Sequence, residues 1–272
     1  MFTHAALYMI RAASLSLACA ASAACALTGL LSGPGDAGGV YMILAVKADG
    51  AAAVQAVNQA AQVILSRCDA LGVYCKVERQ GGEGSNRFRL RVSGAQDFPR
   101  VRSVLLAEGN LELRPVVSMP YPAPMQTYPT RGAAELEARP NSDVLTYEDG
   151  GSREYLVVER EPVISGLDLR DAKAEAEHSG GGEAGNYSIL FSLKPEAANR
   201  FGEWTERNVG RYLAVVLNGN VRSAPYIKSR ITDSGQITGG FTKQQAEDVA
   251  LTLNSGKLPA PVEVLEEGQY KP

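Results

Sequence analysis

Residues 212–227, YLAVVLNGNVRSAPYI, carry the strongest local structural signal in the sequence. The run at 212–217 is almost wholly apolar, which is typical of a buried strand. Asn218 and Gly219 follow it, and Asn-Gly is a preferred centre for a tight turn between antiparallel strands. Residues 221–227 then predict the returning strand. The segment therefore predicts a β-hairpin.

Helix signals flank this hairpin in the second half of the chain. Pro195 favours the start of an amphipathic helix, whose apolar face includes Trp204. Thr242 and Gln245 form a capping box for a last helix, which is expected to end at Gly256. Further strands are predicted at 155–158, 162–169, 187–193 and 261–266, with a short helix at 169–177. This order predicts a second α+β unit.

The first half of the chain also contains a series of predicted strands and helices. An apolar run at 40–46 precedes apolar residues that recur every three or four positions from Val54 to Leu71, so a strand and a helix are expected. Residues 73–79 and 88–92 predict a hairpin, with arginines on one face of its second strand. A helix through Leu105 and a strand at 111–117 complete a ferredoxin-like βαββαβ order over residues 40–117.

Prolines separate the two halves. Six of them fall between positions 115 and 140, and proline restricts both its own backbone and that of the preceding residue. We therefore expect residues 118–154 to form a Pro-rich connector and hinge outside any core. Residues 155–258 are expected to form the second unit, and 259–272 a returning strand and tail. The predicted fold class is α+β.

The first 35 residues have the features of an export segment. Residues 12–31 carry no charge, Arg11 precedes them and Asp36 follows. Small residues at 21–26 suit cleavage, Cys25 suits lipoprotein processing, and the apolar length suits an uncleaved anchor. The sequence leaves these three fates open, and all of them place the body outside the cytoplasm. We thus expect a periplasmic or otherwise extracytoplasmic protein whose only membrane contact is at its N-terminus.

Cys68 and Cys75 lie close in sequence, at the end of the predicted helix and the start of the next strand. In an oxidising compartment they have the placement of a disulfide. Two small core residues would give the same pattern, and the sequence does not decide between these alternatives.

Composition excludes several functions. Basic and acidic residues number 27 and 30, giving a net charge of −3, so no nucleic-acid partner is expected. There are two histidines, and His4 lies in the predicted leader. His178, Cys68 and Cys75 are too few and too scattered for a zinc site, so we expect no metal and no cofactor.

Catalytic motifs also fail their structural tests. Gly180, Gly182 and Gly185 fit G-x-G-x-x-G, but they follow a predicted helix and precede a strand, which is the reverse of a dinucleotide site. Asp171 and Glu175 fit a solvated helix face better than an acid pair. No nucleophile can be paired with a base, so the sequence predicts a protein that is not an enzyme.

Several ordered segments resemble the periplasmic domain of the SecD family, a subunit of the bacterial preprotein translocase. In the head of that domain the matching segments are ISGLDLRDAK (164–173), FSLKPEAANRFGEWTERNVGRYLAVVLNGNVRSAPYI (191–227) and QITGGFTKQQAEDVALTLNSGKLPAPVEV (236–264). In its base they are SRCDALGVYCKV (66–77) and NLELRPVV (110–117). The resemblance covers roughly residues 40–266.

The resemblance implies a base near the membrane, a head joined to it by a hinge, and binding of emerging unfolded preprotein. It also implies SecF and the SecYEG translocon as partners. Residues 262–265 then have two possible places, as the last strand of the head or as a strand of the base. Members of the family continue into membrane helices that use the proton gradient, and no apolar run follows before Pro272. We therefore expect that this polypeptide does not carry the proton-coupled step alone.

Two functions remain open after this comparison. One is an export factor that binds preprotein, and the other is a stand-alone envelope interaction module that keeps the SecD head fold without translocation. Polypeptide binding needs an exposed strand edge or an apolar groove. The residues expected to line it lie near the Ser-Ala-Pro and Ile-Thr-Gly turns; ordinary sheet and turn positions are the alternative interpretation. The residues are Ala224, Pro225, Tyr226, Ile237 and Phe241.

Overall fold

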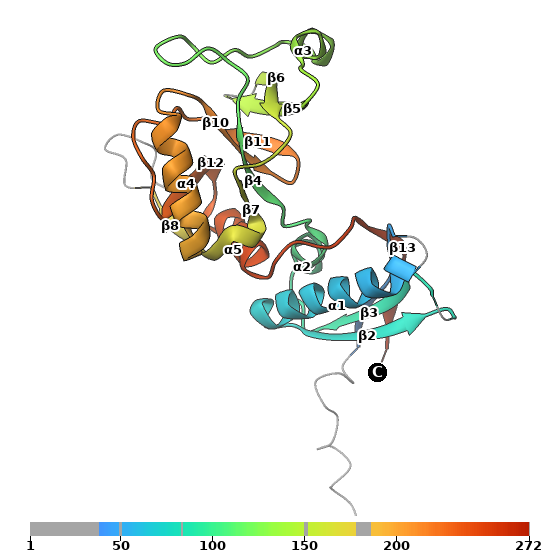
Figure 1. Ribbon diagram of the computed structural model, residues 1–272. Coiled ribbons are helices and arrows are strands. Elements are labelled where there is room, and N and C mark those ends of the chain that lie inside the picture. Colours follow the sequence, from blue (N-terminus) through green and yellow to red (C-terminus); the bar gives the residue numbers. More distant parts are fainter. Residues whose placement is uncertain (1–37, 49–50, 83, 150–151, 178–185, 272) are drawn as a thin grey trace, which may run out of the picture. The chain divides into compact units, whose positions relative to one another are not determined.

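The first and last strands of the described chain pair with each other (Figure 1). The structure, a computed structural model, describes residues 38–48, 51–82, 84–149, 152–177 and 186–271. The predicted leader at 1–35 lies outside these ranges, as do His178, Gly180, Gly182 and Gly185. The α+β fold class is confirmed by the mixture of sheets and helices.

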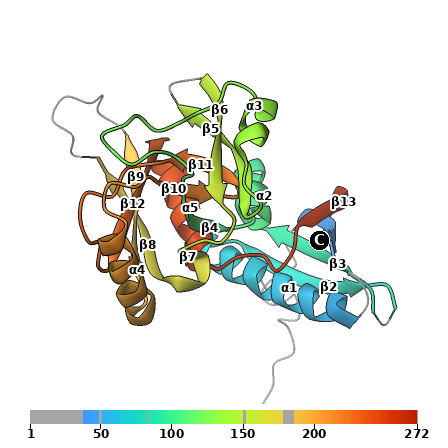
Figure 2. The same ribbon diagram turned by 45° about the horizontal axis from the view of Figure 1, so that its top comes forward.

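One unit, which we call the base, is an antiparallel sheet of strand order β13-β1-β3-β2 with two helices. Its elements are β1 (Gly39–Val46), α1 (Ala51–Leu71), β2 (Tyr74–Gln80), β3 (Arg87–Ser93), α2 (Phe98–Leu106) and β13 (Val262–Tyr270). The helix α1 runs along β2 and β3 in both views (Figures 1 and 2). The expected βαββα order is therefore present. The strand β13, from the far end of the chain, completes the sheet.

Alternation of side chains explains the base sheet. Phe88, Leu90 and Val92 of β3 are buried in the core, together with Val57 and Ile64 of α1. The intervening arginines of β3 lie on the other face, because successive side chains of a strand point to opposite sides. This confirms the prediction of a strand with one wet, basic face.

The other unit, which we call the head, contains a six-stranded sheet of order β6-β5-β11-β10-β4-β7 and a three-stranded sheet of order β12-β9-β8. The strands of the first sheet are β4 (Leu111–Pro115), β5 (Ser142–Asp149), β6 (Ser152–Glu159), β7 (Ile164–Ser165), β10 (Leu213–Leu217) and β11 (Asn220–Ser223). The second has β8 (Leu169–Ala176), β9 (Tyr187–Leu193) and β12 (Ser234–Phe241). The helices are α3 (Arg131–Glu137), α4 (Pro195–Arg207) and α5 (Lys243–Asn254), with a 3₁₀ turn at Gly166–Asp168.

The hairpin predicted at 212–227 is confirmed. Val216 of β10 pairs antiparallel with Val221 of β11. Asn218 and Gly219 between them have φ of 49° and 78°, which are the left-handed values that an Asn-Gly turn supplies. The capping box of Thr242 and Gln245 is also present at the start of α5.

The strand expected to close the first unit belongs to the head instead. Leu113 of β4 pairs with Val215 of β10, and both are buried in the head core. The place of that strand in the base is taken by β13, whose Val264 pairs with Leu44 of β1. The prediction that residues 111–117 complete the base is therefore wrong, whereas the alternative place for 262–265 in the base sheet is confirmed.

The helix predicted at 169–177 is also wrong, because the segment is strand β8. Ala172 pairs with Phe191 of β9 and is buried, while Asp171 and Lys173 on either side of it are exposed. Asp171 and Glu175 are thus not neighbours on a helix face. They lie four residues apart along one strand, on the same side of the sheet.

The predicted connector, 118–154, contains ordered elements. Its β5 pairs in parallel with β11 and antiparallel with β6. Val144 of β5 packs with Tyr128, Ala134 and Val157 in a small core. The expectation that this whole segment lies outside any core is therefore wrong, because its strand has apolar residues that pack against β6 and α3.

A buried arginine fixes the connector strand β5 to β4. Arg114 Nη2 donates to Asp143 Oδ2 at 2.6 Å, and Arg114 Nε donates to the Glu159 carbonyl at 2.7 Å. The hydrogen bond from Arg114 Nη2, with a further one from Arg160, holds the pKa of the Asp143 carboxyl below its ordinary value. The carboxylate therefore stabilises the folded state in its charged form.

We expect Asp143→Asn to lower the free energy of unfolding by about 1–2 kcal/mol near neutral pH, since the half-exposed carboxylate is partly screened by solvent. A depressed folded pKa stabilises the protein fully above the ordinary carboxyl pKa of about 4. That stabilisation is lost as the pH falls through the folded pKa. Urea unfolding of both proteins across this range tests the expectation, and a difference that persists unchanged in acid contradicts it.

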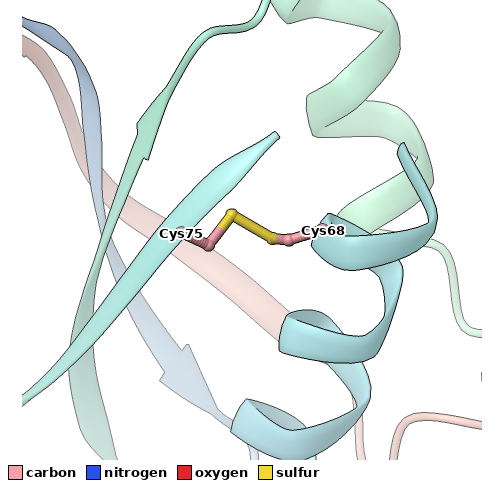
Figure 3. The surroundings of a disulfide bond; sticks show 2 residues. All are labelled: Cys68 and Cys75. Atoms are coloured by element: carbon pink, nitrogen blue, oxygen red, sulfur yellow. A yellow bond between two sulfur atoms is a disulfide. The ribbon is translucent and has the colours of Figure 1, made fainter. Parts of the chain in front are cut away.

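Cys68 and Cys75 form a disulfide in the structure (Figure 3). Their Cα atoms lie 6.1 Å apart. Cys68 is buried near the end of α1, and Cys75 belongs to the adjacent strand β2. The bond fixes the end of α1 against the sheet, directly beside Arg67.

Candidate functional site

Three tyrosines meet where the Pro-rich segment passes over the head. The rings of Tyr121 and Tyr226 are stacked, with centroids 4.1 Å apart and an interplanar angle of 6°. Tyr212 meets Tyr226 edge to face, with centroids 6.3 Å apart. The Lys228 ammonium lies 5.6 Å from the centroid of the Tyr226 ring. The cluster joins the segment before α3 to the residues around the hairpin.

Hydrogen bonds hold the Pro-rich segment in this place. Tyr121 N donates to the Gly210 carbonyl at 2.7 Å, and Tyr212 Oη donates to the Ala123 carbonyl at 2.6 Å. Gly210 in turn donates to the Ile227 carbonyl. The prolines near Tyr121 restrict the backbone further. The cluster is therefore built on ordered backbone.

Large apolar side chains are exposed on the chain segments next to the tyrosine stack. Tyr121 is 51% exposed, Met119 69% and Val209 53%. Met119 lies two residues before Tyr121, and Val209 precedes Gly210, which accepts the Tyr121 hydrogen bond. We call Met119, Tyr121, Val209 and Tyr226 the tyrosine surface. Exposed apolar residues on neighbouring segments are a feature of interaction sites.

The structure separates the five residues predicted to bind polypeptide. Ala224 and Tyr226 are half-buried and pack against a small core of the six-stranded sheet, and Pro225 between them is exposed. Ile237 and Phe241 are buried in the main head core. The five residues therefore do not form one surface. Tyr226 is the one that belongs to the tyrosine surface.

Phe241 also borders a cavity away from the tyrosine surface. The cavity is bounded by α2, the β10–β11 turn, the end of β12 and α5. Its walls mix apolar side chains, including Val104 and Leu253, with the polar Arg222 and Asp248. Asp248 is already bound by Arg100, whose Nη2 lies 2.7 Å from Asp248 Oδ1. The cavity walls therefore carry charged groups as well as apolar ones.

Met119, Tyr121 and Val209 were not predicted as binding residues from the sequence. Tyr121 and Met119 fall in the Pro-rich segment, which was expected to lie apart from the head. Val209 follows the end of α4 at Arg207 and is exposed. The combination of Tyr and Met with several prolines was the available signal, since such segments favour recognition.

The described residues show no group of three or more Cys, His, Asp or Glu side chains placed to hold a metal ion. Within the same residues, no helix has the length and apolar character needed to cross a membrane.

Comparison with known proteins identifies the class first. Residues 142–260 match the family model of the SecDF P1 head subdomain. This match covers the part of the chain from β5 to the segment after α5. The chain as a whole resembles the periplasmic base and head of the protein translocase subunit SecD.

Two relatives show the extent of the similarity. Protein translocase subunit SecD of Aquifex aeolicus is 38% identical over 211 residues, which are 78% of this chain and 39% of the relative. SecD of Koribacter versatilis is 36% identical over 221 residues, 80% of this chain and 39% of the relative. The chain therefore spans about two fifths of the length of these relatives, which are named as protein translocase subunits.

Solved structures agree with this identification. SecDF in a super-membrane-facing form matches with a TM-score of 0.65 and 25% identity over 86% of this chain and 30% of that one. A structure of SecDF, a membrane component that enhances protein export, matches with a TM-score of 0.61 and 25% identity. This second match covers 83% of this chain and 98% of that one, so base and head occur together in a known structure.

Proposed function

We propose that this protein is a SecD-like export factor that binds emerging unfolded preprotein on the outer side of the inner membrane and assists Sec-dependent translocation. The similarity to SecD over base and head supports a role in protein export. The tyrosine surface supports the more specific role of binding a chain, and it is the observation that carries the proposal.

The chemistry of the tyrosine surface suits an unfolded chain. Unfolded polypeptides expose apolar side chains that a folded protein buries, together with free backbone donors and acceptors. Tyr121 and Tyr226 offer large, rigid faces for apolar contact, and tyrosine also has a hydroxyl for backbone groups. Met119 adds a flexible side chain that adapts to different partners. This combination favours binding many sequences over catalysis on one.

The resemblance also supports a set of partners and a location. We propose that the protein acts with SecF and the SecYEG translocon, outside the cytoplasm. We further propose that residues 1–35 direct export, and that any membrane contact is made through them. The division into base, hinge and head belongs to the same proposal, with the chain crossing between base and head after α2 and again after α5.

A binding experiment with one client in two states tests the proposal. We expect the purified protein to bind a permanently unfolded, reduced and alkylated secretory protein about tenfold more tightly than its folded form, which corresponds to about 1.4 kcal/mol. Fluorescence anisotropy of the labelled client gives both affinities. Equal affinity for the two forms, or binding to the folded form alone, contradicts the proposal and favours the stand-alone interaction module.

A further inference from the structure

Arg67 is buried at the place where the chain passes between base and head. It lies on α1, one residue before Cys68, and none of its surface is exposed. Among the described residues, no carboxylate oxygen lies within 4.0 Å of its side-chain nitrogens. A buried guanidinium without an ion-pair partner needs another compensation.

Backbone carbonyls supply that compensation. Arg67 Nη1 donates to the carbonyls of Val104 at 3.1 Å, Leu105 at 3.0 Å and Ala107 at 2.5 Å. These carbonyls belong to the last turn and C-cap of α2, where helix carbonyls lack partners within the helix. A positive charge is favoured at this end of a helix by its dipole.

The other terminal nitrogen of Arg67, Nη2, contacts the segment that returns from the head to the base. Arg67 Nη2 donates to the Gly256 carbonyl at 2.9 Å, just after the C-cap of α5. One planar side chain therefore binds the outgoing segment after α2 and the returning segment after α5. A lysine ammonium, whose three donors radiate from one point, does not reproduce this fork.

Neighbouring residues show how tightly the two crossings are held. Gly109 has φ of +69°, and a Cβ at this position would lie 2.8 Å from Arg67 Nη2 and 3.0 Å from the Gly256 carbonyl oxygen. Leu258 N donates to the Glu108 carbonyl at 2.9 Å, and the Leu258 side chain is buried in the base core. The crossings thus run against each other, with the guanidinium between them.

We propose that Arg67 is a positioning residue that holds the head in place relative to the base, by binding both crossing segments through their carbonyl groups. The inference does not depend on what the tyrosine surface binds. Loss of the fork is expected to free the returning segment from the outgoing one while each unit keeps its own core. The orientation of the head then depends on the remaining contacts between α2 and α5, among them the Arg100–Asp248 ion pair.

Distance measurements between the units test this inference. Spin labels on unnatural amino acids at Gln59 of α1 and Asn199 of α4, both exposed, report the separation of base and head. We expect the distance distribution of full-length Arg67→Lys to be about twofold broader than that of the wild type. The matched control is Arg102→Lys, because Arg102 contacts Glu267 within the base. It is expected to leave the distribution unchanged.

Gly109→Ala provides an independent variant, since it keeps Arg67 and inserts a methyl group between the fork and Gly256. It is also expected to broaden the distribution, and it decides the question if Arg67→Lys does not fold. Folded variants with the wild-type distribution overturn the inference. So does equal broadening in the Arg102→Lys control.

Discussion

Replacement of Arg67 by methionine is expected to lower the free energy of unfolding by about 3–5 kcal/mol, because several buried carbonyls lose their donor at once. Four carbonyls accept hydrogen bonds from this side chain, at the ends of two helices. Burial lowers the pKa of Arg67 to about 10, so the side chain is still charged near neutral pH. Methionine fills much of the volume but donates no hydrogen bond.

Urea unfolding of the two proteins measures this loss. Arg102→Met is the matched control, because Arg102 is 42% exposed in its side chain and its ion pair with Glu267 is on the surface. The control is expected to change stability by less than about 1 kcal/mol. A loss no greater in Arg67→Met than in the control would show that the carbonyls find other donors.

Tyr121→Ala is expected to weaken binding of an unfolded client by about 10- to 30-fold, which is typical of losing an aromatic side chain at the centre of an interface. The substitution removes an exposed ring that stacks on Tyr226, so it takes apolar area away from the tyrosine surface with little change to the core. The same anisotropy assay gives the affinity.

Tyr74→Ala is the control for this substitution. Tyr74 is 42% exposed and lies on β2 of the base. Its removal deletes the same number of atoms from a comparable environment and is expected to leave client affinity within about twofold of the wild type. If the two variants bind equally well, the tyrosine surface is not the binding site.

The fold was predicted from sequence where local chemistry determines the structure. The Asn-Gly turn of the β10–β11 hairpin needs left-handed backbone that these residues readily adopt, so its prediction needed no tertiary information. The alternation of arginine and apolar side chains in β3 was also a local signal. By contrast, the sequence of β4 indicates a strand but not its partner, and pairing with β10 depends on contacts 100 residues away.

Tertiary context also explains the error at β8. Its sequence, LRDAKAEA, is rich in residues that favour helices, yet pairing with β9 and burial of Ala172 make it a strand. Arg67 lies in the segment SRCDALGVYCKV, whose resemblance to the SecD family did not predict a role for it. It falls on the buried side of α1 between Ile64 and Cys68, and a charged residue in an apolar helix stripe was the signal for its role.

Photocrosslinking in living cells tests the central claim most directly. A photoreactive amino acid at Met119, which is 69% exposed, samples whatever contacts the tyrosine surface, and one at Leu265 of β13 is the control on the base. We predict adducts with nascent exported chains from Met119 and not from Leu265. Adducts of Met119 with a single folded partner, or no adducts with exported chains, would contradict the account.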